Sequence, residues 1–209
     1  MLSINLRKLT PARISQLKYI VFLLCLLPAA LLSWRFFNDD LGANPVEAIT
    51  RGSGDWLLRF LLITLAITPL RKLTQWNWLV RLRRMLGLYA FFYGVLHLIT
   101  YLWLDQFFDW AGILKDVWKR PFITVGFAAF VLMIPLAVTS LNAMIRLLGG
   151  KRWQLLHRSV YAVGVLGVLH YWWLVKLDIR EPLIYAAVLA ILLAARLLRN
   201  KPGAQKQGA

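Results

Sequence analysis

Three histidines carry the chemistry that this sequence can support, and all three fall within apolar stretches: His97, His157 and His170. Ionisable side chains inside membrane-spanning stretches are costly and usually functional. His97 and His170 also close the same short motif, in Gly94-Val95-Leu96-His97 and Gly167-Val168-Leu169-His170. Because neutral imidazole is a common ligand of transition metals, the repeated motif predicts a metal-containing centre built from this pair.

Two imidazoles without further ligands favour haem iron over other metals. Zinc needs three or four nitrogen, sulfur or oxygen ligands, more than this pair supplies. Because the chain has a single cysteine, Cys25, a disulfide within the chain, a zinc finger and a cysteine-ligated cluster are also excluded. A porphyrin supplies four nitrogens itself, so His97 and His170 suffice as axial ligands. The sequence has no Cys-x-x-Cys-His motif, which predicts a non-covalent haem b. With both axial positions filled, such a haem would carry electrons.

The positions of His97 and His170 within their stretches match. Each follows a basic residue by 12 or 13 residues and precedes an aspartate by eight. At a rise of about 1.5 Å per residue, both lie in the outer half of the membrane. Gly94 and Gly167 lie one turn earlier on the same helix face, and we expect them to leave room for the porphyrin.

His157 leaves more than one role open. It lies 13 residues before His170, about 20 Å nearer the inner side, and an ideal helix turns by about 220° over that distance. The equivalent inner position on the earlier stretch holds Arg83 and Arg84, with no histidine. His157 could ligate a second haem with a weak or non-histidine partner, contact a flavin or quinone, or be structural.

Basic residues close to these stretches are candidate anion ligands. Arg83, Arg84, Arg152 and Arg158 lie at the inner mouths of the histidine-bearing stretches and could hold a flavin phosphate or haem propionates. Membrane topology offers a second explanation, since cytoplasmic loops are rich in Lys and Arg.

The elements that position these residues must be membrane helices. The chain is 60% hydrophobic and 16% charged, with a mean hydropathy of +0.62, whereas soluble domains carry about 25% charged residues. The net charge of +16 comes from residues at the ends of apolar runs, which argues against nucleic acid as a partner and for membrane lipids. We predict an all-α integral membrane protein, a six-helix bundle with spans at 19–34, 56–70, 85–104, 121–145, 153–175 and 182–198.

The distribution of charge predicts the orientation. Most Lys and Arg fall in the inner segments of the six-span arrangement, whereas all nine Asp and Glu fall in the outer ones, so both termini are predicted to be cytoplasmic. The expected organisation is a cytoplasmic segment at 1–18, a membrane domain at 19–198 and a cytoplasmic tail at 199–209. The outer loop 105–120 spaces its apolar residues as a short interfacial helix would.

Several motifs resemble a known family. Histidines on the third and fifth of six spans resemble the ferric reductase-like transmembrane superfamily, which includes the NADPH oxidases. Residues 41–46 (LGANPV), 67–70 (ITPL), 83–98 and 153–157 (WQLLH) resemble the haem-binding membrane subunits of periplasmic methionine sulfoxide reductase systems, over about residues 15–198. The superfamily's inner histidine on the third span is absent here. Its 13-residue spacing on the fifth span is kept, which weakens the ideal-helix objection to His157.

This resemblance implies a bacterial inner-membrane cytochrome, an electron-transfer subunit that does not itself reduce methionine sulfoxide. It would take electrons from the quinone pool or from a cytoplasmic flavin reductase. It would pass them to a periplasmic molybdenum-containing subunit, in a heterodimer that repairs oxidised periplasmic proteins. The family is also associated with FMN.

Two other functions stay open. A ferric or superoxide-generating reductase would share the fold. A small transporter is disfavoured, because no span contains an acid and no inverted half-repeat is evident. The sequence lacks a G-x-G-x-x-G motif, and few residues follow Leu198, so we expect donor and acceptor to be other molecules.

Overall fold

The computed structural model describes residues 9–175 and 178–197, and within these ranges the regular structure is entirely helical. The α-helices are α1 (Pro11–Phe37), α2 (Pro45–Thr74), α3 (Val80–Ile99), α4 (Trp110–Lys119), α5 (Pro121–Val138), α6 (Asn142–Leu148), α7 (Gly150–His157), α8 (Val160–Leu174) and α9 (Arg180–Leu197). A 3-10 helix, η1 (Asn77–Leu79), precedes α3, and a π-helix, η2 (Thr100–Asp105), continues it. The all-α prediction is confirmed for this part of the chain.

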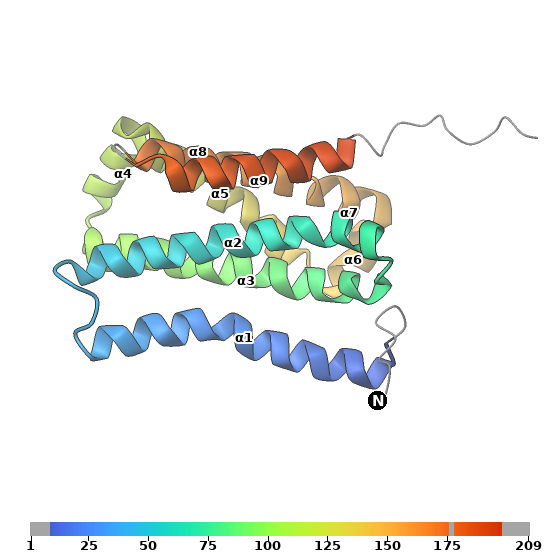
Figure 1. The fold of residues 1–209 in the computed structure, drawn as a ribbon. Coiled ribbons are helices and arrows are strands. Elements are labelled where there is room, and N and C mark those ends of the chain that lie inside the picture. The colour runs from blue at the N-terminus through green and yellow to red at the C-terminus, as the bar shows by residue number, and fades with distance from the viewer. Residues whose placement is uncertain (1–8, 176–177, 198–209) are drawn as a thin grey trace, which may run out of the picture.

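The long helices lie side by side along one direction (Figure 1), with α1, α2 and α3 next to one another and α5, α8 and α9 on the other side of α2 and α3. The most extensive packing is between α2 and α3 and between α5 and α8. We call the end that holds α4 the outer end and the end that holds η1 and α7 the inner end, after the predicted topology.

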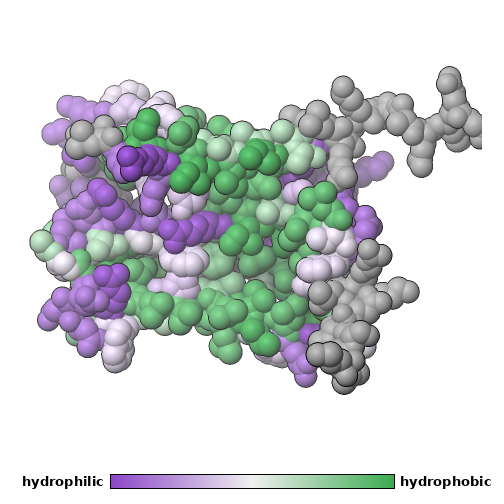
Figure 2. All heavy atoms as spheres, in the orientation of Figure 1, coloured by the Kyte–Doolittle hydropathy of each residue, from purple (hydrophilic) through white to green (hydrophobic). Residues whose placement is uncertain are grey.

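The lateral surface of the bundle is apolar. Figure 2 shows a broad hydrophobic surface over the middle of the long helices, with hydrophilic side chains gathered toward the ends. Three helical stretches are long and apolar enough to cross a membrane: Pro11–Phe37, Asn77–Asp105 and Pro121–Val138. They contain the first and third predicted spans and the part of the fourth that ends at Val138. The other three predicted spans fall on α2, α7–α8 and α9, and the count of six remains a prediction.

Two predicted spans are interrupted. The predicted span 121–145 ends as a helix at Val138, because Thr139 and Ser140 turn their hydroxyls back onto carbonyls of the preceding turn, at 2.6 and 2.7 Å. The predicted span 153–175 breaks after His157, where Arg158 and Ser159 form tight bonds to carbonyls three residues earlier. The ideal-helix phase between His157 and His170 therefore does not apply.

The first helix starts earlier than the predicted span and bends in its middle. Thr10 caps it and Pro11 begins it, so the predicted N-terminal segment 1–18 is helical from Pro11 onward, whereas the predicted tail 199–209 lies outside the described residues. Near Pro28 the Tyr93 hydroxyl donates to Cys25 O (2.8 Å) and accepts from Ala29 N–H (3.0 Å). A side chain inserted into a helix ladder beside a proline bends the helix, as Figure 1 shows for α1.

The outer loop contains the helix that the sequence predicts. Asp109 caps α4 by accepting from Gly112 N–H at 3.1 Å. Ile113 is buried, whereas Trp110, Leu114 and Trp118 are exposed. An amphipathic helix of this kind at the end of an apolar bundle fits the membrane interface.

Candidate functional site

His97 on α3 and His170 on α8 meet near the outer end of the bundle. Their ring centroids are 6.0 Å apart and the rings are nearly perpendicular, at 82°. The two histidines are 73 positions apart in the sequence and come from different helix pairs, α2–α3 and α5–α8. The structure thus brings together the two residues that the repeated motif singled out.

Each ring is held through its Nδ1 atom by a main-chain carbonyl of the partner helix. His97 Nδ1 lies 2.9 Å from Thr50 O on α2, and His170 Nδ1 lies 2.7 Å from Phe122 O on α5. A carbonyl oxygen can only accept, so both Nδ1 atoms must carry the proton. Both Nε2 atoms therefore keep a lone pair, and neither has a hydrogen-bond partner among the described residues. Ligating histidines are oriented by this same type of bond.

Glycines on the partner helices make this approach possible. A Cβ placed on Gly54 would lie 3.1 Å from the His97 ring, and one on Gly126 would lie 2.5 Å from His170 Nδ1. Gly54 and Gly126 each follow the accepting carbonyl by four residues, so they lie on the same helix face as that carbonyl. The sequence interpretation missed both glycines. The one available signal was their presence in apolar helices, which often marks a close approach.

Gly94 and Gly167 have different neighbours from the ones expected. A Cβ on Gly94 would lie 2.9 Å from Leu57 Cδ1 and 3.5 Å from Phe130, and one on Gly167 would lie 3.5 Å from Leu58 Cδ1. The space beside Gly94 is therefore filled by side chains of α2 and α5, and the expectation of open room there is corrected: this glycine lets the helices pack closely. A porphyrin contact at either glycine remains a prediction.

The paired imidazoles fit an iron porphyrin. Bonds between a metal ion and an imidazole nitrogen are about 2 Å long, so two rings that share an ion from opposite sides have centroids about 6 Å apart. Within residues 9–175 and 178–197, no group of three or more His, Cys, Asp or Glu side chains could hold a metal ion. A metal at this pair thus needs equatorial ligands from outside the protein, as haem provides.

His157 lies at the inner end in a different environment. The Thr139 hydroxyl donates to Pro135 O (2.6 Å), so it accepts from His157 Nε2–H at 3.0 Å. The Trp153 indole stacks on the imidazole at 4.0 Å, and its Nε1–H donates to Thr139 O at 2.9 Å. The proton of His157 is thus on Nε2, the reverse of the outer pair, and its Nδ1 holds the lone pair.

The four candidate arginines have different surroundings in the structure. Arg83 and Arg158 line a cavity of about 180 Å³ together with His157 and Trp153. Arg84 instead donates to Asn142 Oδ1, and Arg152 is exposed. A second cavity of about 150 Å³ adjoins the first, sharing Arg83 and Tyr161. Its other lining residues include Thr68 and Arg196, which the sequence interpretation did not select.

Comparison with known proteins assigns this chain to a family. Residues 53–168 match the model of the ferric reductase like transmembrane component family, a stretch that holds His97 and His157 and ends two residues before His170. The chain belongs to this family and, within it, to the MsrQ proteins, as the following relatives show.

Three relatives carry the name "Protein-methionine-sulfoxide reductase heme-binding subunit MsrQ". The protein of Azospira oryzae is 62% identical over 192 residues, which are 91% of this chain and 82% of the relative. That of Herminiimonas arsenicoxydans is 58% identical over 190 residues, 90% and 87%. That of Ralstonia nicotianae is 56% identical over 203 residues, 96% and 93%.

Proposed function

We propose that this chain is a haem b-binding, electron-transferring subunit of a bacterial inner-membrane methionine sulfoxide reductase system. The observation that carries the proposal is the outer histidine pair. The ring centroids of His97 and His170 lie 6.0 Å apart. Main-chain carbonyls accept from Nδ1 of each ring, which leaves the lone pair of each Nε2 available for a metal ion. The relatives' names, which state haem binding, support the same assignment.

His97 and His170 would hold the haem as its two axial ligands, and the haem when bound supplies one-electron transfer. The chain's own contribution is to fix both imidazoles before the haem arrives. The bonds to Thr50 O and Phe122 O set the tautomer and limit rotation of the rings. Electron transfer gains from this, because a fixed ligand frame moves little when the charge changes.

The partners follow from the proposed orientation, with six spans and both termini cytoplasmic. The haem-ligand pair lies toward the outer end, so the electron acceptor is a periplasmic molybdenum-containing catalytic subunit that forms a heterodimer with this chain. The donor is the quinone pool or a reduced flavin at the inner end. In this arrangement the chain delivers electrons and the periplasmic subunit reduces methionine sulfoxide in oxidised proteins.

At the inner end, we assign His157 to contact with a flavin or quinone. Its imidazole stacks on Trp153 and lines a cavity beside Arg83 and Arg158, which suits a flat, polar donor such as FMN. A second haem on His157 would need either Nδ1 as the ligand or release of Nε2 from Thr139.

Purified protein in lipid nanodiscs tests the proposal. We expect a low-spin haem spectrum, reduction by quinol or by a flavin with its reductase, and reoxidation that depends on the periplasmic subunit and methionine sulfoxide. Reoxidation by ferric iron or oxygen alone, unaffected by the periplasmic subunit, would instead indicate a ferric or superoxide-generating reductase. A preparation without haem would contradict the proposal and revive the transporter.

A further inference from the structure

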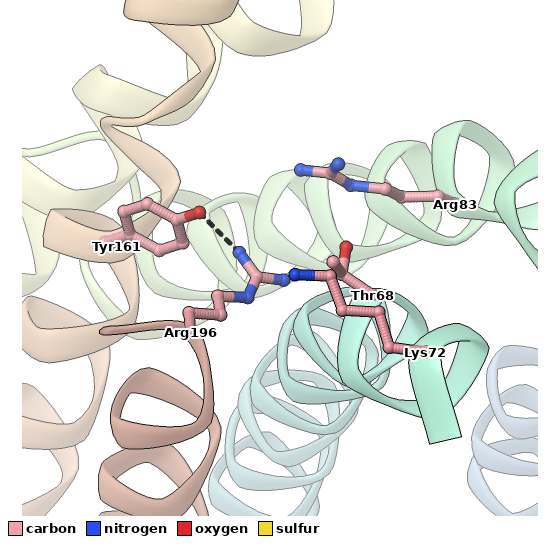
Figure 3. A pocket seen from close by; sticks show the side chains of 5 residues that line it. All are labelled: Thr68, Lys72, Arg83, Tyr161 and Arg196. Atoms are coloured by element: carbon pink, nitrogen blue, oxygen red, sulfur yellow. Dashed lines mark hydrogen bonds between the residues drawn. The ribbon is translucent and has the colours of Figure 1, made fainter. Parts of the chain in front are cut away.

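The smaller cavity at the inner end collects cationic and hydrogen-bond-donating side chains from four helices. It is lined by Thr68 and Lys72 of α2, Arg83 of α3, Tyr161 of α8 and Arg196 of α9. Figure 3 shows Arg83, Lys72 and Arg196 reaching into one space from three helices, with the Tyr161 hydroxyl close to Arg196. The cavity encloses about 150 Å³, which suits one tetrahedral anionic group and is below the range of drug-sized ligand sites.

Arg196, in the last turn of α9, is held by two hydrogen bonds, but its Nε is left without a partner in the described part of the chain. Its Nη1 donates to Tyr161 OH and its Nη2 donates to Leu65 O, both at 2.6 Å. Among the described residues, its Nε is the one buried side-chain nitrogen or oxygen without a hydrogen-bond partner. A buried donor left unpaired costs about 1–3 kcal/mol, so a ligand that accepts this bond would stabilise the protein.

The other lining groups are also free to donate. Among the described residues, no side-chain hydrogen bond or ion pair engages Lys72 or Arg83, and the Thr68 hydroxyl bonds to nothing. Tyr161 accepts from Arg196, so its own proton remains available. The cavity thus presents several donors and lacks a carboxylate among its lining residues.

No acid of the chain can neutralise this cluster. All nine Asp and Glu lie at the outer end, and every ion pair in the described residues is formed there. Topology accounts for basic residues at the inner end, but it predicts side chains that point to water, as Arg81 does. Three cations that line one cavity without an acid beside them instead suit an anionic ligand.

We propose that this cavity is a binding site for a phosphate group. Phosphate offers several strong acceptor oxygens and a charge that matches Lys72, Arg83 and Arg196. The group could belong to a soluble phosphomonoester, with the rest of that molecule extending into the adjoining cavity beside Trp153 and His157, or to an anionic lipid. The proposal deepens the donor side of the proposed function and does not require the haem.

The test measures thermal unfolding in nanodiscs of neutral phosphatidylcholine. Inorganic phosphate at about ten times its dissociation constant should raise the midpoint by about 3–6 °C over chloride of equal ionic strength. Arg83→Gln and Lys72→Gln should each weaken binding by about tenfold or more, since each removes a charged hydrogen bond. Arg81→Gln is the matched control, because Arg81 lies on the same helix but is exposed.

Two further measurements distinguish the possible sources of the phosphate group, a soluble phosphomonoester and an anionic lipid. FMN should bind more tightly than riboflavin, which lacks the phosphate, if the ligand is a soluble phosphomonoester. Phosphatidylglycerol in the nanodisc should raise the midpoint, and added phosphate should then have no effect, if the ligand is a lipid. Equal responses of wild type and Arg83→Gln in all arms would overturn the phosphate site. The haem spectrum of the same samples separates that failure from failure of the proposed function.

Discussion

Helix pairs α2–α3 and α5–α8 present one histidine each, and they do so by the same local device. In both pairs the imidazole donates to a carbonyl of the partner helix, Thr50 O or Phe122 O, and lies over the glycine four residues later. A side chain at that position would crowd the imidazole as it approaches the carbonyl. In both pairs the position of the imidazole thus depends on a glycine of the neighbouring helix as well as on the histidine.

The pairs differ in how they are supported and in how tightly the ring fits. Around α2–α3, the aromatic rings of Trp56, Phe60 and Tyr93 pack together, with Phe60 stacked on Tyr93 at 5.3 Å. The α5–α8 pair has shorter helices, interrupted at Val138 and before Val160, yet it leaves less space behind its ring. We therefore expect haem binding to tolerate substitutions around His97 better than substitutions around His170.

The largest effect is expected from removal of either histidine. His97→Ala and His170→Ala should each remove most of the low-spin haem spectrum, because each deletes one axial ligand. Haem content and redox spectra of the purified variants measure this directly. Full haem loading with unchanged spectra in both variants would contradict the proposal that each helix pair supplies one haem ligand.

His157→Ala should affect electron entry and leave the outer pair intact. The outer haem spectrum should persist while reduction by the inner donor falls severely, because His157 lines an inner cavity at the end of α7, whereas His97 and His170 lie near the outer end of the bundle. Stopped-flow reduction measures the rate. Thr139→Val is the control, since it removes the hydrogen bond to Nε2 and keeps the ring. A parental rate in His157→Ala would leave only a structural role for this residue.

The tightness of the two fits is tested by adding one methyl group to each partner glycine. Gly126→Ala should reduce haem affinity more than Gly54→Ala, because the new Cβ would lie 2.5 Å from His170 Nδ1 against 3.1 Å from the His97 ring. Overpacking of this kind costs about 1–3 kcal/mol, or about five- to 150-fold in affinity. Haem titration of the apoprotein measures it. Gly87→Ala, with an ordinary contact of 3.6 Å to Thr64 Cγ2, is the control, and equal losses in all three variants would contradict the argument.

The smallest effect is expected from the loss of hydrogen bonds that support the α2–α3 pair. Tyr93→Phe loses both bonds of the hydroxyl that bridges Cys25 O and Ala29 N–H, and should destabilise the protein by about 1–3 kcal/mol without displacing the haem bands. Tyr89→Phe loses one bond, to Phe22 O, and should cost less. Thermal unfolding compares the two. A spectral change in Tyr93→Phe would show that the aromatic cluster also shapes the haem site.

Much of the candidate site could be predicted from the sequence because its signals are local. Three features can be seen without any knowledge of packing: histidines in apolar stretches, the repeated Gly-Val-Leu-His and the absence of other ligand types. The class of fold followed from composition, since 60% hydrophobic residues exceed what a soluble core can bury. The helical state of the outer loop followed from the spacing of Trp110, Leu114 and Trp118.

What the sequence could not supply is the register between helices. Thr50 O and Phe122 O are main-chain atoms that every residue possesses, so nothing in the sequence marks them as the acceptors for His97 and His170. Nothing in the sequence indicates that Leu57 and Phe130 fill the space beside Gly94, because rotation of a helix about its axis is decided by its neighbours. The interruption at Thr139 likewise arises from hydroxyls that compete for carbonyls within an otherwise apolar run.

The sequence by itself thus determined the class of protein, the histidine pair and the excess of basic residues at one end, since composition and spacing act along a single helix. The tertiary structure alone decided which glycines admit the imidazoles and which nitrogen of each ring carries the proton. It also decided that Arg196 would fold back to Tyr161 and Leu65 O, so that a basic helix end became the wall of a cavity. These features depend on distances between helices, which only side-chain packing across the bundle can set.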